Sequence, residues 1–270
     1  MNFLFWNLNK KPLERLVADL AERHEIDVLI LAECEIPSDL LLQHLNRRRR
    51  RAFESTEDSH CEKIVIYTRF PTRFIKPRLE SSQRWTIREL GLPRRQTLLL
   101  AAVHHPGKLY WRDTSQSSEC YELSSAIRKA EQEVGHSRTV LVGDLNMNPF
   151  EVGMVAANGL NAVMARKVAQ RGTQAVLRRR YPFFYNPMWS HFGDGIEGPS
   201  GTFYRNKNEH VTFFWNMFDQ VLLRPELLSI FRNAELKILS ANGERSLLRN
   251  GVPDKKNASD HLPLLFKLDL

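Results

Sequence analysis

One stretch near the middle of the chain constrains the fold more than any other. Residues 140–149 read Val-Leu-Val-Gly-Asp-Leu-Asn-Met-Asn-Pro, so a short apolar run ends abruptly in polar residues and a proline. Such a run predicts a buried strand with polar side chains at its C-terminal end. Asp144 and Asn146 are two residues apart and would face the same side of a strand. Oxygen ligands placed in this way suit Mg²⁺ or a phosphate beside it, although Asp and Asn are also common in tight turns.

Polar groups of the same kind flank five other apolar runs. They are Asn7 and Asn9 after residues 3–6, Glu33 after 27–32, His104 and His105 after 98–103, Asp219 at the start of 218–223, and Asp260 with His261 before 264–268. An acid inside an apolar run is costly unless it is paired or binds something. Any one of these short motifs can occur by chance, and their common position at strand ends is what indicates a shared site.

The order of these motifs resembles that of the endonuclease/exonuclease/phosphatase superfamily, which includes DNase I-like nucleases, abasic-site endonucleases, sphingomyelinases and inositol-polyphosphate phosphatases. The matching positions are Asn7, Glu33, His104, Asp144 with Asn146, Asp219, and Asp260 with His261. The resemblance extends from residue 2 to the last strand. It implies an α/β fold of the DNase I-like kind, a four-layer α/β/β/α sandwich of two mainly antiparallel sheets flanked by helices.

Length and composition agree with one globular catalytic domain over residues 1–270. The hydrophobic fraction of 42% is ordinary for a folded protein. No apolar run approaches the roughly 18 residues that a transmembrane helix needs. We expect no signal peptide, because the apolar run at residues 3–6 is too short for one and Asn7 follows it at once. Cys34, Cys61 and Cys120 lack metal-ligand spacing, and we expect a cytoplasmic protein.

Helices and strands are expected to alternate. Apolar spacing predicts a helix opened by Pro12, another from about Ser38, and a longer one over 115–134. Strands are expected at 63–69, 84–90, 96–103, 139–142, 201–204, 217–223, 234–239 and 262–268. The irregular segment 165–214 is either a substrate-binding rim or a small cluster that covers a sheet edge.

The resemblance implies a Mg²⁺-dependent site, with Mn²⁺ as a substitute. Glu33 and Asp260 are the expected metal-binding carboxylates, and Glu35 could assist Glu33. Asn9 stands near the ion where some relatives carry an acid, and an amide there should weaken any second metal site.

The same resemblance assigns the catalytic groups. His261 would align the attacking water or contact the scissile phosphate, and Asp219 would fix its tautomer. His104 would act as general acid or as an electrostatic donor; strand alternation sends His105 to the opposite face, so only one of the two can serve the site. Asp144 would sit near the metal or position the water. Asn7 and Asn146 would donate to the phosphate.

Charge points to a polyanionic substrate, because the net charge is +8. Basic runs occur at Arg47–Arg51, which could also be the solvated end of a helix, and at Arg178, Arg179 and Arg180, followed by Tyr181 and Phe183–Tyr185. We expect the second run to contact substrate, although its aromatics could belong to the core. Trp189, Phe192 and Phe213–Trp215 could form a membrane-docking loop, but we expect core packing.

These features predict a metal-dependent phosphodiester hydrolase, most simply a nuclease acting on DNA or RNA. Abasic-site enzymes usually carry tyrosine at the position of His104, which disfavours that subtype. The alternative is a phosphatase or phosphodiesterase for phosphoinositides, phospholipid head groups or small phosphate esters.

Overall fold

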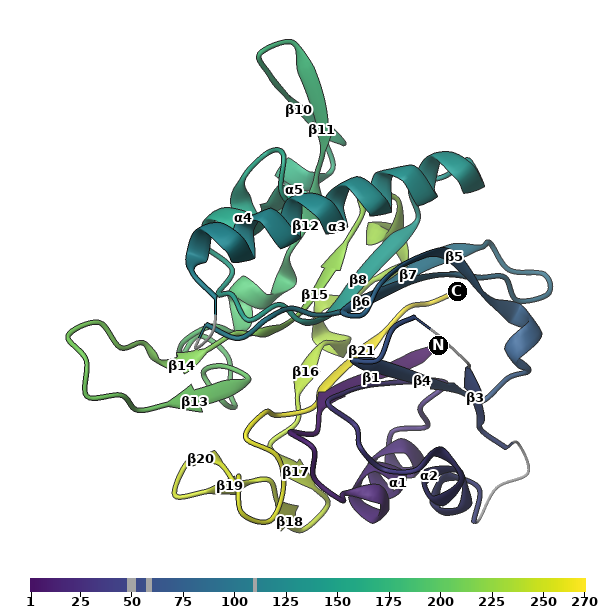
Figure 1. Ribbon diagram of the computed structural model, residues 1–270, viewed down its shortest axis with the longest axis vertical. Helices are drawn as coiled ribbons and strands as arrows, with labels where there is room; N and C mark the ends of the chain where they lie inside the picture. Colours follow the sequence, from purple (N-terminus) through teal and green to yellow (C-terminus); the bar gives the residue numbers. More distant parts are fainter. Residues whose placement is uncertain (48–51, 57–59, 109–110) are drawn as a thin grey trace.

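A computed structural model describes residues 1–47, 52–56, 60–108 and 111–270. Figure 1 shows four layers, with α1 and α2 below one sheet and α3 above a second sheet that lies on the first. This is the α/β/β/α sandwich that the motif order predicts. The main helices are α1 (Glu14–Arg23), α2 (Ser38–Leu45) and α3 (Asp113–Val134); two short ones are α4 (Val152–Val155) and α5 (Arg166–Ala169).

The first sheet holds six strands from both ends of the chain. Their order is β16 (Lys237–Ile238), β21 (Leu264–Lys267), β1 (Asn2–Asn7), β2 (Val28–Ala32), β4 (Ile64–Thr68) and β3 (Glu54–Thr56). Only β1 and β2 run parallel; the other neighbours are antiparallel.

The second sheet holds seven strands. Their order is β5 (Ile75–Ser82), β6 (Trp85–Leu90), β7 (Leu98–His104), β8 (Thr139–Asp144), β15 (Asp219–Leu223), β12 (Phe184–Tyr185) and β9 (Ala162–Val163). The pairs β7–β8 and β12–β9 are parallel. Because both faces of the central strands are covered, their sequences are continuous apolar runs instead of alternating ones.

Strand alternation divides the core into three clusters. Phe3 and Phe5 of β1 face the second sheet, whereas Leu4 and Trp6 face α1 and α2. In the same way Leu100 of β7 points between the sheets and Leu99 points toward α3. Period-two side-chain placement on a strand explains this division. Each strand therefore joins two layers.

Most of the expected elements are present, with shifted ends. The first helix begins at Glu14, after Pro12, and α3 ends at Val134, directly before Gly135, whose φ of 73° is the left-handed conformation that glycine adopts easily. The strand expected at 234–239 is reduced to β16 after the 3₁₀ turn η4 (Asn233–Glu235), and β5 was not expected. No helix among the described residues is long and apolar enough to span a bilayer.

Small hairpins and turns complete the fold. The hairpins are β10 (Thr173–Val176) with β11 (Arg179–Pro182), β13 (Phe203–Arg205) with β14 (Phe214–Asn216), β17 (Ala241–Asn242) with β18 (Arg245–Ser246), and β19 (Leu248–Arg249) with β20 (Val252–Pro253). Further 3₁₀ turns are η1 (Thr72–Phe74), η2 (Pro187–His191) and η3 (Pro225–Ile230). The expected rim segment 165–214 therefore includes the β10–β11 hairpin and the β13–β14 hairpin as far as Phe214, and Figure 1 shows the two hairpins projecting in different directions.

Candidate active site

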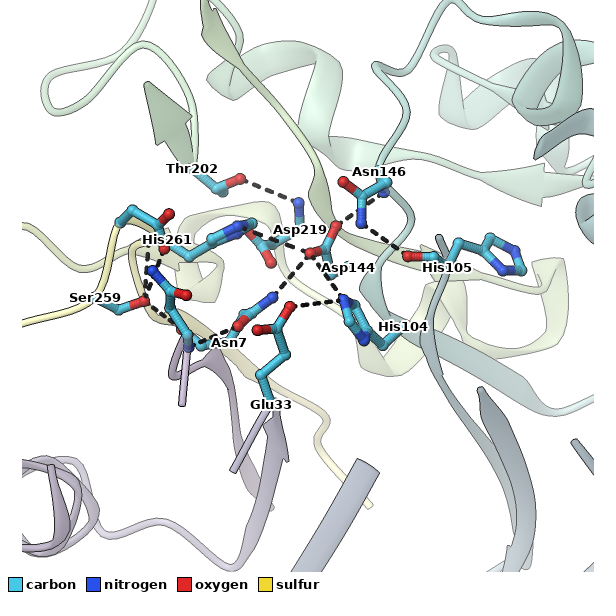
Figure 2. Close-up of polar contacts among 12 residues, drawn as sticks. Asn7, Glu33, His104, His105, Asp144, Asn146, Thr202, Asp219, Ser259 and His261 are labelled. Atoms are coloured by element: carbon cyan, nitrogen blue, oxygen red, sulfur yellow. Dashed lines mark hydrogen bonds and ion pairs between the residues drawn. The ribbon is translucent and has the colours of Figure 1, made fainter. Parts of the chain in front are cut away.

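Polar residues from both sheets meet at one end of the sandwich. The parallel strands β1 and β2 end there with Asn7 and Glu33, and the parallel strands β7 and β8 end there with His104 and Asp144. Asp219 begins β15 directly opposite Asp144, since β15 is antiparallel to β8. Carboxyl ends of parallel strands share an edge, so four apolar runs deliver their terminal side chains to one place. Figure 2 shows these groups pointing toward one another.

Asp144 lies at the centre of the site and is 1% exposed. Its Oδ2 accepts a hydrogen bond from Asn7 Nδ2 at 3.0 Å, and its Oδ1 accepts the main-chain N–H of Asn146 at 2.9 Å. Both imidazoles also approach Oδ2, His104 Nε2 at 3.7 Å and His261 Nε2 at 3.8 Å. Hydrogen bonds from two amide N–H groups, together with the nearby imidazole rings, hold this buried carboxylate in one orientation.

His261 and Asp219 form a buried pair. His261 Nδ1 donates to Asp219 Oδ2 at 2.8 Å. Burial alone lowers the pKa of the His261 imidazole, but the carboxylates of Asp219 and Asp144 outweigh it and raise that pKa to about 10. Burial raises the pKa of Asp219, while the charged ring of His261 lowers it in return. The ring is therefore an imidazolium at neutral pH, with Nε2–H directed toward the centre of the site.

His104 contacts Glu33 across the two sheets. Nε2 of His104 lies 3.2 Å from Glu33 Oε1. This contact is the largest cause that lowers the pKa of the Glu33 carboxyl, against the opposing effect of burial. Glu33 is thus a carboxylate at neutral pH, and 25% of its side chain remains accessible to solvent. It is the more open of the two acids that reach His104.

His105 points away from the site, as strand alternation predicts. Its ring is fully buried under α3, where Nε2 lies 3.8 Å from Cys120 Sγ, and burial lowers its pKa to about 3. Its main-chain carbonyl still supports the site, because it accepts the side-chain N–H of Asn146 at 2.8 Å. His105 is therefore a neutral core residue, and His104 is the histidine that faces the carboxylates (Figure 2).

The backbone of the site adopts conformations that few side chains tolerate. Glu33, Asn9 and Asn146 have φ of 46°, 48° and 51°. Non-glycine residues in this left-handed region cost about 1 kcal/mol or more and are common at functional sites. Gly143 has a different constraint: a Cβ there would lie 1.9 Å from the carbonyl oxygen of Val103. The glycine before Asp144 is required because β7 and β8 approach so closely.

Several expected metal-binding residues lie around this centre. Asn9 donates its main-chain N–H to Asn7 Oδ1 at 2.9 Å and so orients that amide. Asp260 is half-buried and adds negative charge beside His261. Glu35 faces solvent, where it pairs with Lys10 at 3.1 Å with 64% of its side chain exposed.

Two further side chains orient the site, and sequence reasoning missed their roles. Ser259 Oγ donates to the carbonyl of Asn7 at 2.6 Å and accepts the N–H of His261 at 3.2 Å. Thr202 Oγ1 accepts the N–H of Asp219 at 3.1 Å. Serine and threonine hydroxyls before a strand are too common in turns to indicate such roles. The serine did carry a signal, as the first residue of the Ser-Asp-His motif.

The basic runs lie elsewhere. Arg178, Arg179 and Arg180 are exposed on the β10–β11 hairpin, which Figure 1 shows projecting past α5. That hairpin leads into β12, whose Tyr185 pairs with Leu223 of β15. Leu223 is the last residue of β15, whereas Asp219 at the catalytic centre is the first. Their expected contact with substrate stays a prediction, and it would be made away from the catalytic groups. Arg47 follows α2, and residues 48–51 lie outside the described part of the chain.

The aromatics near these runs also differ from expectation. Phe183, Phe184 and Tyr185 after the arginines are buried in the core and cannot stack on substrate. By contrast, Phe213 and Phe214, for which we expected core packing, are 56% and 46% exposed. A run of aromatic residues does not show by itself which of its side chains are buried, because their burial depends on the elements that pack against them.

The donor set fits a hard divalent cation. Glu33 and Asp144 supply carboxylate oxygens to the same centre, and Asn7 contributes an amide. Oxygen ligands are what Mg²⁺ and Mn²⁺ prefer. Ligand atoms of Asp144, Asp219 and His261 also lie within 4.8 Å of one another, so these three buried side chains are a second group that could hold an ion.

Comparisons with solved structures identify the fold. The chain is similar to the endonuclease domain of TRAS1, a telomere-specific non-LTR retrotransposon, with 12% identity and a TM-score of 0.56, covering 100% of this chain and 98% of that one. It is similar to TDP2 from D. rerio, complexed with a single strand DNA product, with 16% identity and a TM-score of 0.56, covering 98% and 97%. It is also similar to the 3′ phosphatase NExo from Neisseria, bound to a product DNA hairpin, with 13% identity and a TM-score of 0.56, covering 100% of both chains.

The chain thus shares the fold of these structures, which is the DNase I-like fold that the motif order predicts. No sequence profile of a protein family matches it, and no curated protein matches it by sequence.

Proposed function

We propose that this protein is a metal-dependent phosphodiesterase that cleaves nucleic acid. One observation carries the proposal: Asp144 lies within 4 Å of two imidazoles, and one of these contacts Glu33. Two histidines and two carboxylates around one small space can neutralise a phosphoryl group and align a water molecule. The net charge of +8 favours a polyanionic substrate.

Each side chain has a role that follows from its contacts. The His261 imidazolium, held by Asp219, donates from Nε2 to a phosphoryl oxygen as negative charge develops there. Asp144 accepts a proton from the attacking water, or orients it, because its oxygens are fixed by Asn7 and Asn146. His104 directs Nε2 toward the same space and can donate to a phosphoryl or leaving oxygen.

We propose Mg²⁺, with Mn²⁺ as a substitute, as the cation that Glu33 and Asp144 bind. When bound, it supplies positive charge to the phosphoryl group. The contact between Glu33 and His104 at 3.2 Å is consistent with this assignment, because it shows that the carboxylate reaches the centre of the site.

Nucleic acid is favoured over small phosphate esters as the substrate. The similar D. rerio TDP2 and Neisseria NExo structures both hold bound DNA products, and the similar TRAS1 domain is an endonuclease. A phosphatase for inositol phosphates or a phospholipid hydrolase would need the same catalytic groups. The choice between these substrate classes therefore depends on the residues that surround the catalytic groups.

A cleavage assay on purified protein tests the proposal. Single- and double-stranded DNA and RNA are incubated with Mg²⁺, Mn²⁺ or EDTA, with His261→Ala as the control variant. We expect metal-dependent cleavage of at least one polymer, reduced by about 10²-fold or more in the variant. Hydrolysis of soluble inositol phosphates without cleavage of any polymer would instead favour the phosphatase function.

A further inference from the structure

A cavity of about 310 Å³ opens beside the catalytic groups. Asn146 belongs to both, because its backbone N–H binds Asp144 while its side chain lines the cavity. The residues that line the cavity also include Gly107, Lys108, Phe203, Arg205, Lys207, Glu209, Phe213 and Phe218. A volume near the lower end of known ligand sites suits one planar ring with an attached sugar, and it is too small for a base pair.

Aromatic rings form two sides of the cavity. On the catalytic side, the ring of Phe203 lies 4.7 Å from the ring of His261 and is stacked 5.3 Å from that of Phe218. On the outer side, Phe213 is 56% exposed, and its ring lies 5.4 Å from that of Phe150. Exposed aromatic rings next to a phosphate-binding centre are the usual platform for unpaired bases.

Cations surround the mouth of the same cavity. Lys108, Arg205 and Lys207 all line it, together with one acid, Glu209, which pairs with Lys207 at 3.3 Å. Lys108 is partly neutralised by Glu151 and by Asp113 at 3.7 Å. Among the described residues Arg205 forms no ion pair with an acid, so its guanidinium is the group best placed to meet a neighbouring phosphate.

We propose that this cavity binds the unpaired base next to the scissile phosphate, so that the preferred substrate is a single-stranded nucleic acid. The inference rests on the proposed phosphodiesterase function and adds the substrate class. A base within a duplex presents its faces to its neighbours in the stack, and it cannot enter a one-ring cavity unless the strand opens. A lipid head group would use the cations and the catalytic centre, but it has no planar ring to place between Phe203 and Phe213.

Two adjacent phenylalanines give a matched pair of variants. Phe213 lines the cavity, whereas Phe214 is similarly exposed, does not line it, and lies 6.2 Å from Tyr204 by ring centroids. Phe213→Ala should therefore remove stacking, and Phe214→Ala should not. A second variant, Gly107→Leu, fills the cavity without removing any contact, since a Cβ at Gly107 meets only Asn146 Oδ1 at 3.6 Å.

The substrates are chosen to distinguish binding of the base from hydrolysis of the phosphodiester. They are methyl p-nitrophenyl phosphate, which has no base, and the 3′- and 5′-p-nitrophenyl phosphates of thymidine, together with one oligonucleotide offered single-stranded or in a duplex. Unchanged melting temperatures confirm that each variant is folded.

We expect the wild type to cleave the single strand and one thymidine ester faster than the duplex and the methyl ester. Phe213→Ala and Gly107→Leu should each lower kcat/KM for the base-containing substrates by about 5- to 100-fold, with the methyl ester and Phe214→Ala within about twofold.

Three results would overturn the inference. One is equal cleavage of single strand and duplex; another is an equal loss in Phe213→Ala and Phe214→Ala. The third is faster hydrolysis of phosphatidylcholine vesicles than of any nucleotide, with that activity lost in Phe213→Ala, which would assign the cavity to a lipid. In each case cleavage still occurs, so the proposed phosphodiesterase survives. Absence of cleavage of every substrate would refute both.

Discussion

Asp219→Asn should release His261 from its raised pKa. The substitution keeps the size of the side chain but removes the negative charge that lies 2.8 Å from Nδ1. Asp219 is fully buried, so solvent does not screen this charge. The pKa of His261 in this variant therefore tests the electrostatics of the site without any knowledge of the substrate.

The size of the change follows from the pKa of His261. Its surroundings raise that pKa from an ordinary 6.5 to about 10, which corresponds to roughly 4–5 kcal/mol in favour of the charged ring. Asp144 also contributes, with its Oδ2 3.8 Å from Nε2. Since burial opposes the charge, loss of the Asp219 carboxylate should lower the pKa by about 2 units or more.

Stability should change with pH in a defined direction. The folded-state pKa of His261 lies above the unfolded value, so the pair stabilises the protein fully below about pH 6.5, and the effect is lost as pH rises toward about 10. The raised pKa of Asp219, caused by burial, offsets part of this gain. Urea unfolding at pH 6 and pH 9 should show a smaller difference in Asp219→Asn than in wild type.

Proton-detected NMR of ¹³C-labelled histidine measures the pKa directly. The signal of His261 is assigned by its absence in His261→Gln, and Asp269→Asn serves as the control, because that acid pairs with Arg232 at the surface. A His261 pKa in Asp219→Asn within one unit of the wild-type value would refute the assignment of Asp219 as the main source of the shift.

Three other predictions test the packing of the fold and the catalytic role of His104. Gly143→Ala should destabilise the fold by about 3 kcal/mol in urea unfolding, since its Cβ meets the Val103 carbonyl at 1.9 Å, while Gly195→Ala, with open space around it, should be nearly neutral. Arg224→Met should cost about 3–5 kcal/mol because it leaves Glu131, its partner at 2.8 Å, buried and unpaired; no loss of stability would contradict this. His104→Asn should lower kcat by about 10²-fold with the melting temperature nearly unchanged, and an equal loss of stability would indicate a structural role.

The layered fold and the centre of the site could be predicted because strand ends are local features. Each apolar run marks a buried strand, and the polar residue after it must lie at a sheet edge. Asp219 was identifiable because a buried acid in an apolar run needs a partner, and the structure supplies His261. The alternation of His104 and His105 was also predictable, although the face that each occupies depends on the position of α3.

The surroundings of the site could not be read from local sequence. The substrate contact expected for Arg178 to Arg180 stays a prediction, but local sequence did not indicate that their hairpin leads into β12, which pairs with β15 at the end away from Asp219. The neighbouring Phe184 is core because Arg224 and the sheet cover it, with the guanidinium 3.9 Å from the ring centroid. Phe213 was expected in the core and instead borders the cavity. Contacts between distant segments decide these positions, and no periodicity reports them.

In the proposed function, the carboxylates and histidines at the ends of β1, β2, β7 and β8 hydrolyse phosphodiesters with a metal ion. The most direct test is the rate of cleavage of a short single-stranded oligonucleotide as Mg²⁺ is added to EDTA-treated protein, for wild type and for Glu33→Gln. We expect cleavage that begins only with metal in wild type and is reduced by about 10²-fold or more in the variant, whose shape is nearly the same. Cleavage that persists in EDTA, or a Glu33→Gln protein as active as wild type, would contradict the proposed site.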